Sequence, residues 1–234
     1  MSDTKPRTKR RLGDATTAPK TKRRLGTPVE GVSLVPGPRD SMFGMTPFPD
    51  WVTEFRPHQW DAVQEIVREF ESGTDVVFLD APTGSGKTLI AELVRRLLGY
   101  KALYVCSGKD LQAQFLQDFP YAHVLMGRSN YPTLDKPFPF VTCADCNKTG
   151  KGEDAECDWC NEPKRCPYQQ AKNSAMSSQL AVVNTSYLLA EANWIGSFSE
   201  QDFVIADECD MLEGELMNFV KFEVSDGMLR SLNL

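Results

Sequence analysis

Residues 81–88 read Ala81-Pro82-Thr83-Gly84-Ser85-Gly86-Lys87-Thr88, and this stretch decides the fold. An apolar run, 76–79, precedes it. A segment with apolar residues at helical spacing follows it, namely Leu89, Ile90, Leu93, Val94, Leu97 and Leu98. A strand, a glycine-rich turn, Lys-Thr and a helix form, in that order, the context of a phosphate-binding loop. Its backbone N–H groups and the helix N-terminus would both attract phosphate oxygens.

The loop predicts a nucleotide site in which different residues bind the phosphates and the metal ion. Lys87 would reach the β- and γ-phosphates, and the Thr88 hydroxyl would ligate Mg²⁺. The backbone around the phosphates would come from Ala81, Gly84, Ser85 and Gly86. The general pattern begins with Gly where this chain has Ala81. That departure is mild, because Ala can also lie close to a ligand.

A second motif, far downstream, supplies the carboxylates that such a site needs. Residues 202–206 read as a buried strand that ends in Asp207-Glu208-Cys209-Asp210. A carboxylate at the C-terminal end of a parallel strand is well placed to hold the metal of a nucleotide. We expect Asp207 to hold Mg²⁺, directly or through water, and Glu208 to polarise the attacking water. Together the two motifs indicate ATP or GTP hydrolysis.

The length and composition of the chain limit its number of domains and its cellular location. The chain has 234 residues, which suits one large α/β domain with an insertion but is short for two motor domains. No apolar run approaches the roughly 18 residues of a membrane span, and no apolar signal segment opens the chain. We therefore expect a cytoplasmic protein without a membrane partner. Its seven cysteines then point to thiols or metal ligands rather than disulfides.

Charge is divided unevenly along the chain. Residues 1–40 hold ten Lys/Arg and four Asp/Glu, a net +6, and the remainder holds 16 and 28, a net −12. The motif Thr-Lys-Arg-Arg-Leu-Gly occurs at 8–13 and again at 21–26. This composition predicts a disordered basic tail over 1–45. The tail would serve as an electrostatic anchor on nucleic acid or as a solubilising segment.

The globular part alternates between strand and helix patterns. Strands are expected at 75–80, 102–106, 122–126, 180–184 and 202–206, with helical patterns between most of them. This alternation predicts an α/β fold, a parallel sheet covered by helices on both faces. The expected domain is built from 46–126 and 169–234, interrupted by an insertion at 127–168.

The insertion contains five of the seven cysteines: Cys143, Cys146, Cys157, Cys160 and Cys166. It has few aliphatic residues, so a metal centre would have to supply its cross-links. The two Cys-x2-Cys pairs could form a zinc site of four thiolates. Alternatively, the last four cysteines could hold a [4Fe–4S] cluster. We expect Cys106 and Cys209, which follow strands, to be core or loop residues.

The order of these features resembles the iron–sulfur DNA helicases of the XPD and DinG type, in superfamily two. The motifs that carry the resemblance are Arg56-Pro57-His58-Gln59, Ala81–Thr88, Ser107-Gly108-Lys109, Gly127-Arg128-Ser129-Asn130-Tyr131, Cys166-Pro167-Tyr168, Val182–Leu188 and Asp207–Asp210. The resemblance implies a RecA-like motor domain that binds ATP and Mg²⁺ and moves on single-stranded or forked DNA. It also implies that Gln59 reads the adenine.

The resemblance favours iron–sulfur over zinc. It implies that Cys166 is the last cluster ligand and that Cys157 and Cys160 are the middle pair. Cys146 is the preferred first ligand, with Cys143 in reserve, because Thr133 occupies the position where the family's first ligand is common. Short members of this kind suggest a bacterial cell, or one infected by a phage, as the setting.

One departure from the family is large. The family's motors use a second motor domain, and the chain stops 27 residues after Asp207. We therefore expect the chain to be an N-terminal fragment or a truncated gene product that is close to inactive by itself, and a separate chain could supply the second motor domain. Two alternatives stay open: a zinc-ribbon nucleotide hydrolase that remodels nucleic-acid complexes, and a non-catalytic nucleic-acid-binding remnant.

Overall fold

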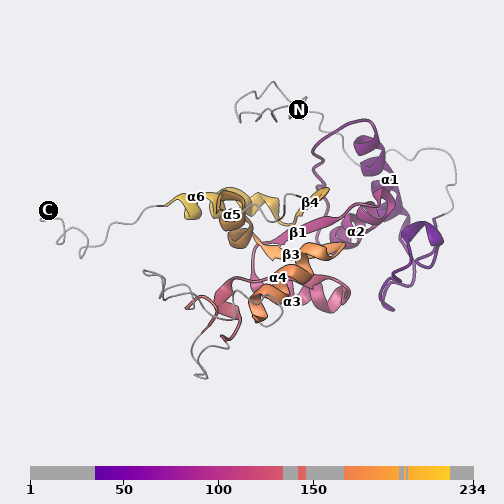
Figure 1. The fold of residues 1–234 in the computed structure, drawn as a ribbon. Helices are drawn as coiled ribbons and strands as arrows, with labels where there is room; N and C mark the ends of the chain where they lie inside the picture. The colour runs from indigo at the N-terminus through magenta and orange to yellow at the C-terminus, as the bar shows by residue number, and fades with distance from the viewer. Residues whose placement is uncertain (1–34, 134–141, 146–165, 195–197, 199, 222–234) are drawn as a thin grey trace, which may run out of the picture. The chain divides into compact units, whose positions relative to one another are not determined.

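The computed structural model describes residues 35–133, 142–145, 166–194, 198 and 200–221, which all belong to one compact unit. Within them, four strands form a parallel sheet in the order β2-β3-β1-β4 (Figure 1). The strands are β1 (Ala102–Cys106), β2 (His123–Val124), β3 (Leu180–Asn184) and β4 (Phe203–Ala206). The predicted α/β fold with a parallel sheet is confirmed.

Helices connect the strands and cover the sheet. The α-helices are α1 (Pro57–Glu71), α2 (Lys87–Leu98), α3 (Lys109–Asp118), α4 (Pro167–Ser177), α5 (Thr185–Trp194) and α6 (Leu212–Val220). Short 3-10 turns are η1 (Ser41–Phe43), η2 (Arg128–Asn130) and η3 (Cys209–Met211). None of these described helices has the length and apolar character needed to cross a membrane.

Alternating residues of the two central strands build two cores. Tyr104 of β1 and Val182 of β3 face one core, which also contains apolar side chains of α1, α2 and α3. Val105 and Val183 face the other core, which contains side chains of α4 and α5. Burial on both faces explains why these strands read as continuous apolar runs. The sheet therefore has helices on both sides, as the sequence predicts.

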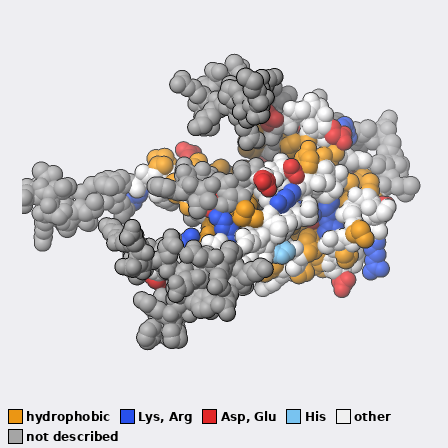
Figure 2. Space-filling view, in the orientation of Figure 1, with side chains coloured by type: hydrophobic (Ala, Val, Ile, Leu, Met, Phe, Trp, Pro, Cys, Tyr) orange, Lys and Arg blue, Asp and Glu red, His pale blue; other side chains and the backbone are white. Residues whose placement is uncertain are grey.

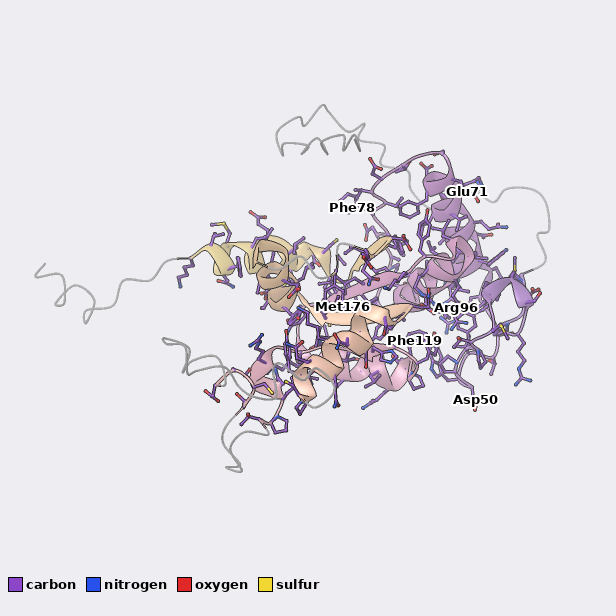
Figure 3. All side chains as sticks on the ribbon, in the orientation of Figure 1. Asp50, Glu71, Phe78, Arg96, Phe119 and Met176 are labelled. Carbon is purple, nitrogen blue, oxygen red and sulfur yellow. The ribbon has the colours of Figure 1, made fainter. Side chains whose placement is uncertain are left out.

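The strand predicted at 75–80 is wrong. This segment joins α1 to α2 without strand pairing, and its Val76 and Phe78 are 64% and 81% exposed. Figure 3 shows Phe78 at the periphery, whereas Arg96 and Phe119 lie in the interior. The two neighbours of β1 are β3 and β4, so no position beside the central strand is left for this segment. An apolar run indicates a tendency to be buried, but it does not supply a hydrogen-bonding partner.

Part of the segment expected to be the basic tail is folded. Phe43, in η1, is buried in the first core and meets Phe55 edge to face, with ring centroids 5.3 Å apart. Asp40 caps η1 by accepting a hydrogen bond from the Met42 N–H. The aromatic side chain of Phe43 thus ties the chain before residue 46 to the domain.

A buried ionic cluster anchors α2 to its surroundings. The Glu92 carboxylate accepts hydrogen bonds from Arg95 Nε at 2.7 Å, Arg96 Nε at 2.6 Å and Tyr121 Oη at 3.0 Å. Arg96 also donates to the Thr46 carbonyl. Burial alone would lower the pKa of Arg95, but the Glu92 carboxylate outweighs it and raises that pKa above its usual value. The single carboxylate of Glu92 therefore binds two guanidinium groups in the interior of the domain.

This cluster predicts a large effect of Glu92→Ala on stability. Removing one partner of a buried ionic group leaves uncompensated charge, which typically costs about 3–5 kcal/mol. We expect chemical denaturation to show a loss of unfolding free energy of that size. The matched control is Glu71→Ala at the exposed end of α1, which should change stability by less than about 0.5 kcal/mol. Equal effects of the two substitutions would contradict this role for Glu92.

Candidate nucleotide site

A cleft of about 660 Å³ brings together three segments that are far apart in the sequence. The first segment contains Arg56 and Gln59 at the start of α1. The second is the phosphate loop with the first turn of α2, and the third is the Asp207–Glu208 pair after β4. The cleft is also lined by Trp51, Val52, Thr53, Glu54, Leu89, Gln114, Asp118 and Phe119. Most of the predicted phosphate and metal residues thus line one cavity, whereas Ala81 and Ser85 are not part of its lining.

The phosphate loop has the backbone that its glycines permit. Gly84 and Gly86 have φ values of 79° and 84°, in the left-handed region that favours glycine. A Cβ atom on Gly86 would clash with Gln59 Nε2, so a larger residue here would displace the Gln59 amide from the loop. Lys87 Nζ donates to the Ala81 carbonyl at 3.0 Å, across the loop. The loop therefore curls around the lysine side chain.

Gln59 fixes the loop from α1 rather than projecting freely into the cleft. Its Nε2 donates to the Ser85 carbonyl at 3.0 Å, and its Oε1 accepts from the Arg56 N–H at 3.0 Å. Arg56 Nη1 in turn donates to the Gly84 carbonyl at 3.4 Å. Gln59 thus supports the phosphate loop and the start of α1 at once.

The sheet and a tyrosine position Asp207. Its backbone N–H donates to the Val105 carbonyl at 2.9 Å, which continues the β1–β4 pairing by one residue. Carboxylate oxygen Oδ2 accepts from Tyr104 Oη at 2.6 Å, and Oδ1 accepts from the Glu208 N–H at 3.0 Å. The carboxylate is therefore oriented through both oxygens.

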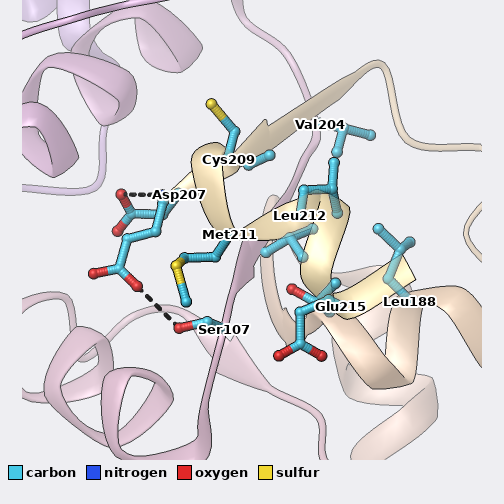
Figure 4. Close-up of a pocket in the computed structure, with 12 residues that line it drawn as sticks. Ser107, Leu188, Val204, Asp207, Cys209, Met211, Leu212 and Glu215 are labelled. Carbon is cyan, nitrogen blue, oxygen red and sulfur yellow. Dashed lines mark hydrogen bonds between the residues drawn. The ribbon is translucent and has the colours of Figure 1, made fainter. Parts of the chain in front are cut away.

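Glu208 has an unusual backbone conformation. It is the only described non-glycine residue with positive φ, at φ 51° and ψ 45°, a conformation that costs about 1–3 kcal/mol. Its Oε2 accepts a hydrogen bond from Ser107 Oγ at 2.9 Å, as Figure 4 shows. Ser107 directly follows β1. The exposed Glu208 carboxylate is therefore held toward the C-terminal end of that strand.

Beside this pair lies a small pocket of about 150 Å³, between β4, α5 and α6 (Figure 4). Its lining is largely apolar and includes Leu188, Val204, Met211 and Leu212. The pocket is too small for a nucleotide, because ligand sites usually measure about 300–1,000 Å³. The larger cleft is therefore the candidate nucleotide site.

The residues present fit a nucleotide with Mg²⁺. Ser85 Oγ, in the phosphate loop, is buried without a hydrogen-bond partner among the described residues, which leaves it able to bind a ligand oxygen. Asp207 and Thr88 offer carboxylate and hydroxyl oxygens, the donors that Mg²⁺ prefers. Both contact the Tyr104 hydroxyl, so they lie close together. The oxygen atoms of Thr88 and Asp207 and their positions in the cleft therefore both suit a Mg²⁺ site.

Of the five insertion cysteines, the structure describes Cys143 and Cys166, whereas Cys146, Cys157 and Cys160 lie outside the described residues. Both described cysteines are buried in the second core. Within the described ranges, no three His, Cys, Asp or Glu side chains form a metal-binding group.

The two remaining cysteines lie where the sequence placed them. Cys106 is buried, and its burial, with the nearby Asp207, raises the pKa of its thiol to about 11. The thiol therefore stays protonated, as befits a core residue. Cys209 is exposed in the turn after β4.

The sequence did not point to Tyr104 or Trp51 as site residues, and it indicated Ser107 only as part of the motif Ser107-Gly108-Lys109, not as a partner of Glu208. Tyr104 and Ser107 reach the carboxylates through contacts that span 103 and 101 residues, and Trp51 lines the cleft from before α1. Only the position of Ser107 directly after β1 could have suggested a place near the site, because Tyr104 lies in the middle of that strand. In Figure 2, the visible Lys and Arg side chains are scattered in small groups among acidic and apolar ones.

Comparison with known proteins shows the family to which the chain belongs. Residues 53–217 match the model of the family described as type III restriction enzyme, res subunit. No curated protein and no solved structure matches the chain. The matched residues run from the cleft wall before α1 into α6 and include both motifs. The chain therefore belongs to the type III restriction enzyme res subunit family, within the helicase-like ATPases of superfamily two.

Proposed function

We propose that the chain is an ATP-hydrolysing motor domain that moves on single-stranded or forked DNA, in the manner of the iron–sulfur helicases. One observation carries the proposal: the cleft of about 660 Å³ unites the phosphate loop, Gln59 and the Asp207–Glu208 pair. The family membership supports a helicase-like ATPase. DNA as the track, the cluster and the cytoplasm of a bacterial or phage-infected cell belong to the proposal.

The contacts suggest how these residues divide the work. Lys87, now bonded to the Ala81 carbonyl, is free to exchange that acceptor for a phosphate oxygen. Thr88 and Asp207 would hold Mg²⁺, which neutralises phosphate charge when bound. Glu208 is exposed and would orient and polarise the attacking water. A second motor domain would complete the site with an arginine.

The link to DNA runs through the end of β1. The segment Ser107-Gly108-Lys109 resembles the motif with which such motors touch a DNA backbone, and Lys109 begins α3. Ser107 is also the residue that holds Glu208. A phosphate bound at this segment would therefore lie next to the residue proposed to activate water. This contact offers a direct route from DNA binding to ATP hydrolysis.

The cluster is proposed on the cysteine pattern, with Cys146, Cys157, Cys160 and Cys166 as ligands. Cys143 Sγ donates to the Pro132 carbonyl at 3.3 Å. A thiolate ligand has no proton to donate, so this bond supports Cys143 as the spare cysteine. Zinc held by the two Cys-x2-Cys pairs is the competing assignment, and it would require Cys143.

The first prediction concerns Lys87→Ala. Hydrogen bonds to charged groups contribute about 1.5–3 kcal/mol, so we expect Mg–ATP to bind about 10- to 100-fold more weakly. Isothermal titration calorimetry measures this directly. Lys101→Ala, outside the cleft lining, is the matched control and should bind ATP as the parent does. Unchanged affinity in Lys87→Ala would refute the assignment of the loop.

The second prediction concerns Glu208→Gln. The amide retains the size of the side chain but cannot polarise water as a carboxylate does. We expect ATP affinity to stay within about threefold of the parent, and, in a motor completed by a second motor domain, single-turnover hydrolysis with single-stranded DNA to fall by about 10²–10⁴. Hydrolysis at the parent rate would show that another group activates the water.

The third prediction separates iron–sulfur from zinc. Single Cys→Ser variants of the five insertion cysteines, purified without oxygen, are assayed for iron, zinc and visible absorbance. We expect iron in the parent and in Cys143→Ser, and its loss in the other four variants. If instead zinc is present, Cys143→Ser loses it and Cys166→Ser retains it, then the zinc-ribbon hydrolase replaces the iron–sulfur motor.

A further inference from the structure

Tyr104 is a core residue with a polar end at the nucleotide site. Its side chain is buried in the first core, where its ring lies against that of Phe115 with centroids 4.2 Å apart. Packing on both the strand and α3 leaves the ring little freedom to turn. The position of its hydroxyl is therefore set by the core rather than by the cleft.

That hydroxyl lies between the two side chains proposed to hold Mg²⁺. It donates to Asp207 Oδ2 at 2.6 Å and also contacts the Thr88 side chain. Asp207 belongs to the turn after β4, and Thr88 to the first turn of α2. Tyr104 on β1 is thus the one side chain, among the described residues, shown to contact both.

The contacts of Asp207 leave room for a metal. Each carboxylate oxygen has two lone pairs, and each accepts one hydrogen bond here, from Tyr104 and from the Glu208 N–H. A free lone pair therefore remains on either oxygen for a cation. A lysine or arginine in place of Tyr104 would neutralise Asp207 and repel the ion, whereas a phenol orients the carboxylate and adds no charge.

The phenol also stays a donor. A tyrosine hydroxyl has an ordinary pKa of about 10, so at neutral pH it keeps its proton and donates to the Asp207 carboxylate. A neutral donor with a fixed position is what holds a metal-binding carboxylate in one orientation. The hydroxyl of the partly buried Tyr121 also donates to a carboxylate, that of Glu92, but Tyr121 is not part of the cleft lining.

From this geometry we propose that Tyr104 is a positioning residue for the Mg²⁺ that accompanies the nucleotide. It orients Asp207 toward Thr88 and so prepares the metal site before nucleotide enters. The inference rests on the proposed ATP site and adds to it a residue that neither motif contains. It assigns to a core strand residue a part in metal affinity, and none in contact with the nucleotide itself.

The test compares ADP binding by Tyr104→Phe and parent in calorimetric titrations over a series of Mg²⁺ concentrations and in EDTA. Phe keeps the ring packing and removes only the hydroxyl. Loss of such a supporting partner typically costs about 10- to 100-fold in metal affinity. We expect the Mg²⁺ concentration for half-maximal enhancement of ADP binding to rise about tenfold or more, with metal-free ADP affinity unchanged.

Two further variants make the result specific. Tyr121→Phe, which also removes a hydroxyl bound to a carboxylate, should keep the parent Mg²⁺ dependence. In an Asp207→Asn background, adding Tyr104→Phe should change the Mg²⁺ dependence by less than about twofold, because Tyr104 acts through Asp207. Thermal melting checks that all variants are folded.

The outcomes separate this inference from the proposed function. If the parent binds no ADP with or without Mg²⁺, the proposed ATP site fails, and this inference fails with it. If the parent shows Mg²⁺-enhanced binding and Tyr104→Phe shows the same dependence, only the role of Tyr104 is overturned. If Tyr104→Phe raises the required Mg²⁺ concentration just as much in the Asp207→Asn background, the role of Tyr104 is overturned as well.

Discussion

The register between β1 and β4 is the constraint on which the candidate site depends. Main-chain hydrogen bonds set it at both ends: the Asp202 N–H donates to the Lys101 carbonyl and the Asp207 N–H to the Val105 carbonyl, each at 2.9 Å. A slip of one residue would turn the side chains of β1 to the opposite faces. Tyr104 would then leave Asp207, and the core would lose its alternation.

Helix α2 supplies the other half of the site and is held from its far end. Its first turn carries Lys87 and Thr88, and its later turns carry Glu92 and the two arginines that Glu92 binds. The buried cluster ties this helix to the segment around Thr46 and to Tyr121. Because a helix is stiff over this length, the cluster helps to determine where the phosphate loop lies relative to β1.

Local patterns predicted most of the fold. Apolar runs located β1 and β3, whose alternating residues are buried on both faces of the sheet, and β4, whose Phe203 and Ile205 pack on the first core while Val204 is exposed. The loop glycines and Lys-Thr located the start of α2 at Lys87. The same reasoning failed at 75–80, where an equally apolar run lies unpaired, since pairing depends on a neighbouring strand that the run itself cannot reveal.

Only the site residues that belong to the two sequence motifs could be predicted. The two motifs named Lys87, Thr88, Asp207 and Glu208, and the cleft contains all four. The contacts of Tyr104 and Ser107 with the two carboxylates could not be predicted, because the partners lie 103 and 101 residues away and become neighbours only through the sheet. The strained backbone of Glu208 likewise depends on the turn that follows β4.

The central claim is that the phosphate loop and the Asp207 turn form one metal–nucleotide site. Iron-mediated affinity cleavage tests it most directly: Fe²⁺ replaces Mg²⁺ beside ADP, and ascorbate with peroxide then cuts the backbone next to the bound ion. The account predicts ADP-dependent cuts at two places, beside Thr88 and beside Asp207. ADP-dependent cutting beside only one of them, or at neither, would contradict it.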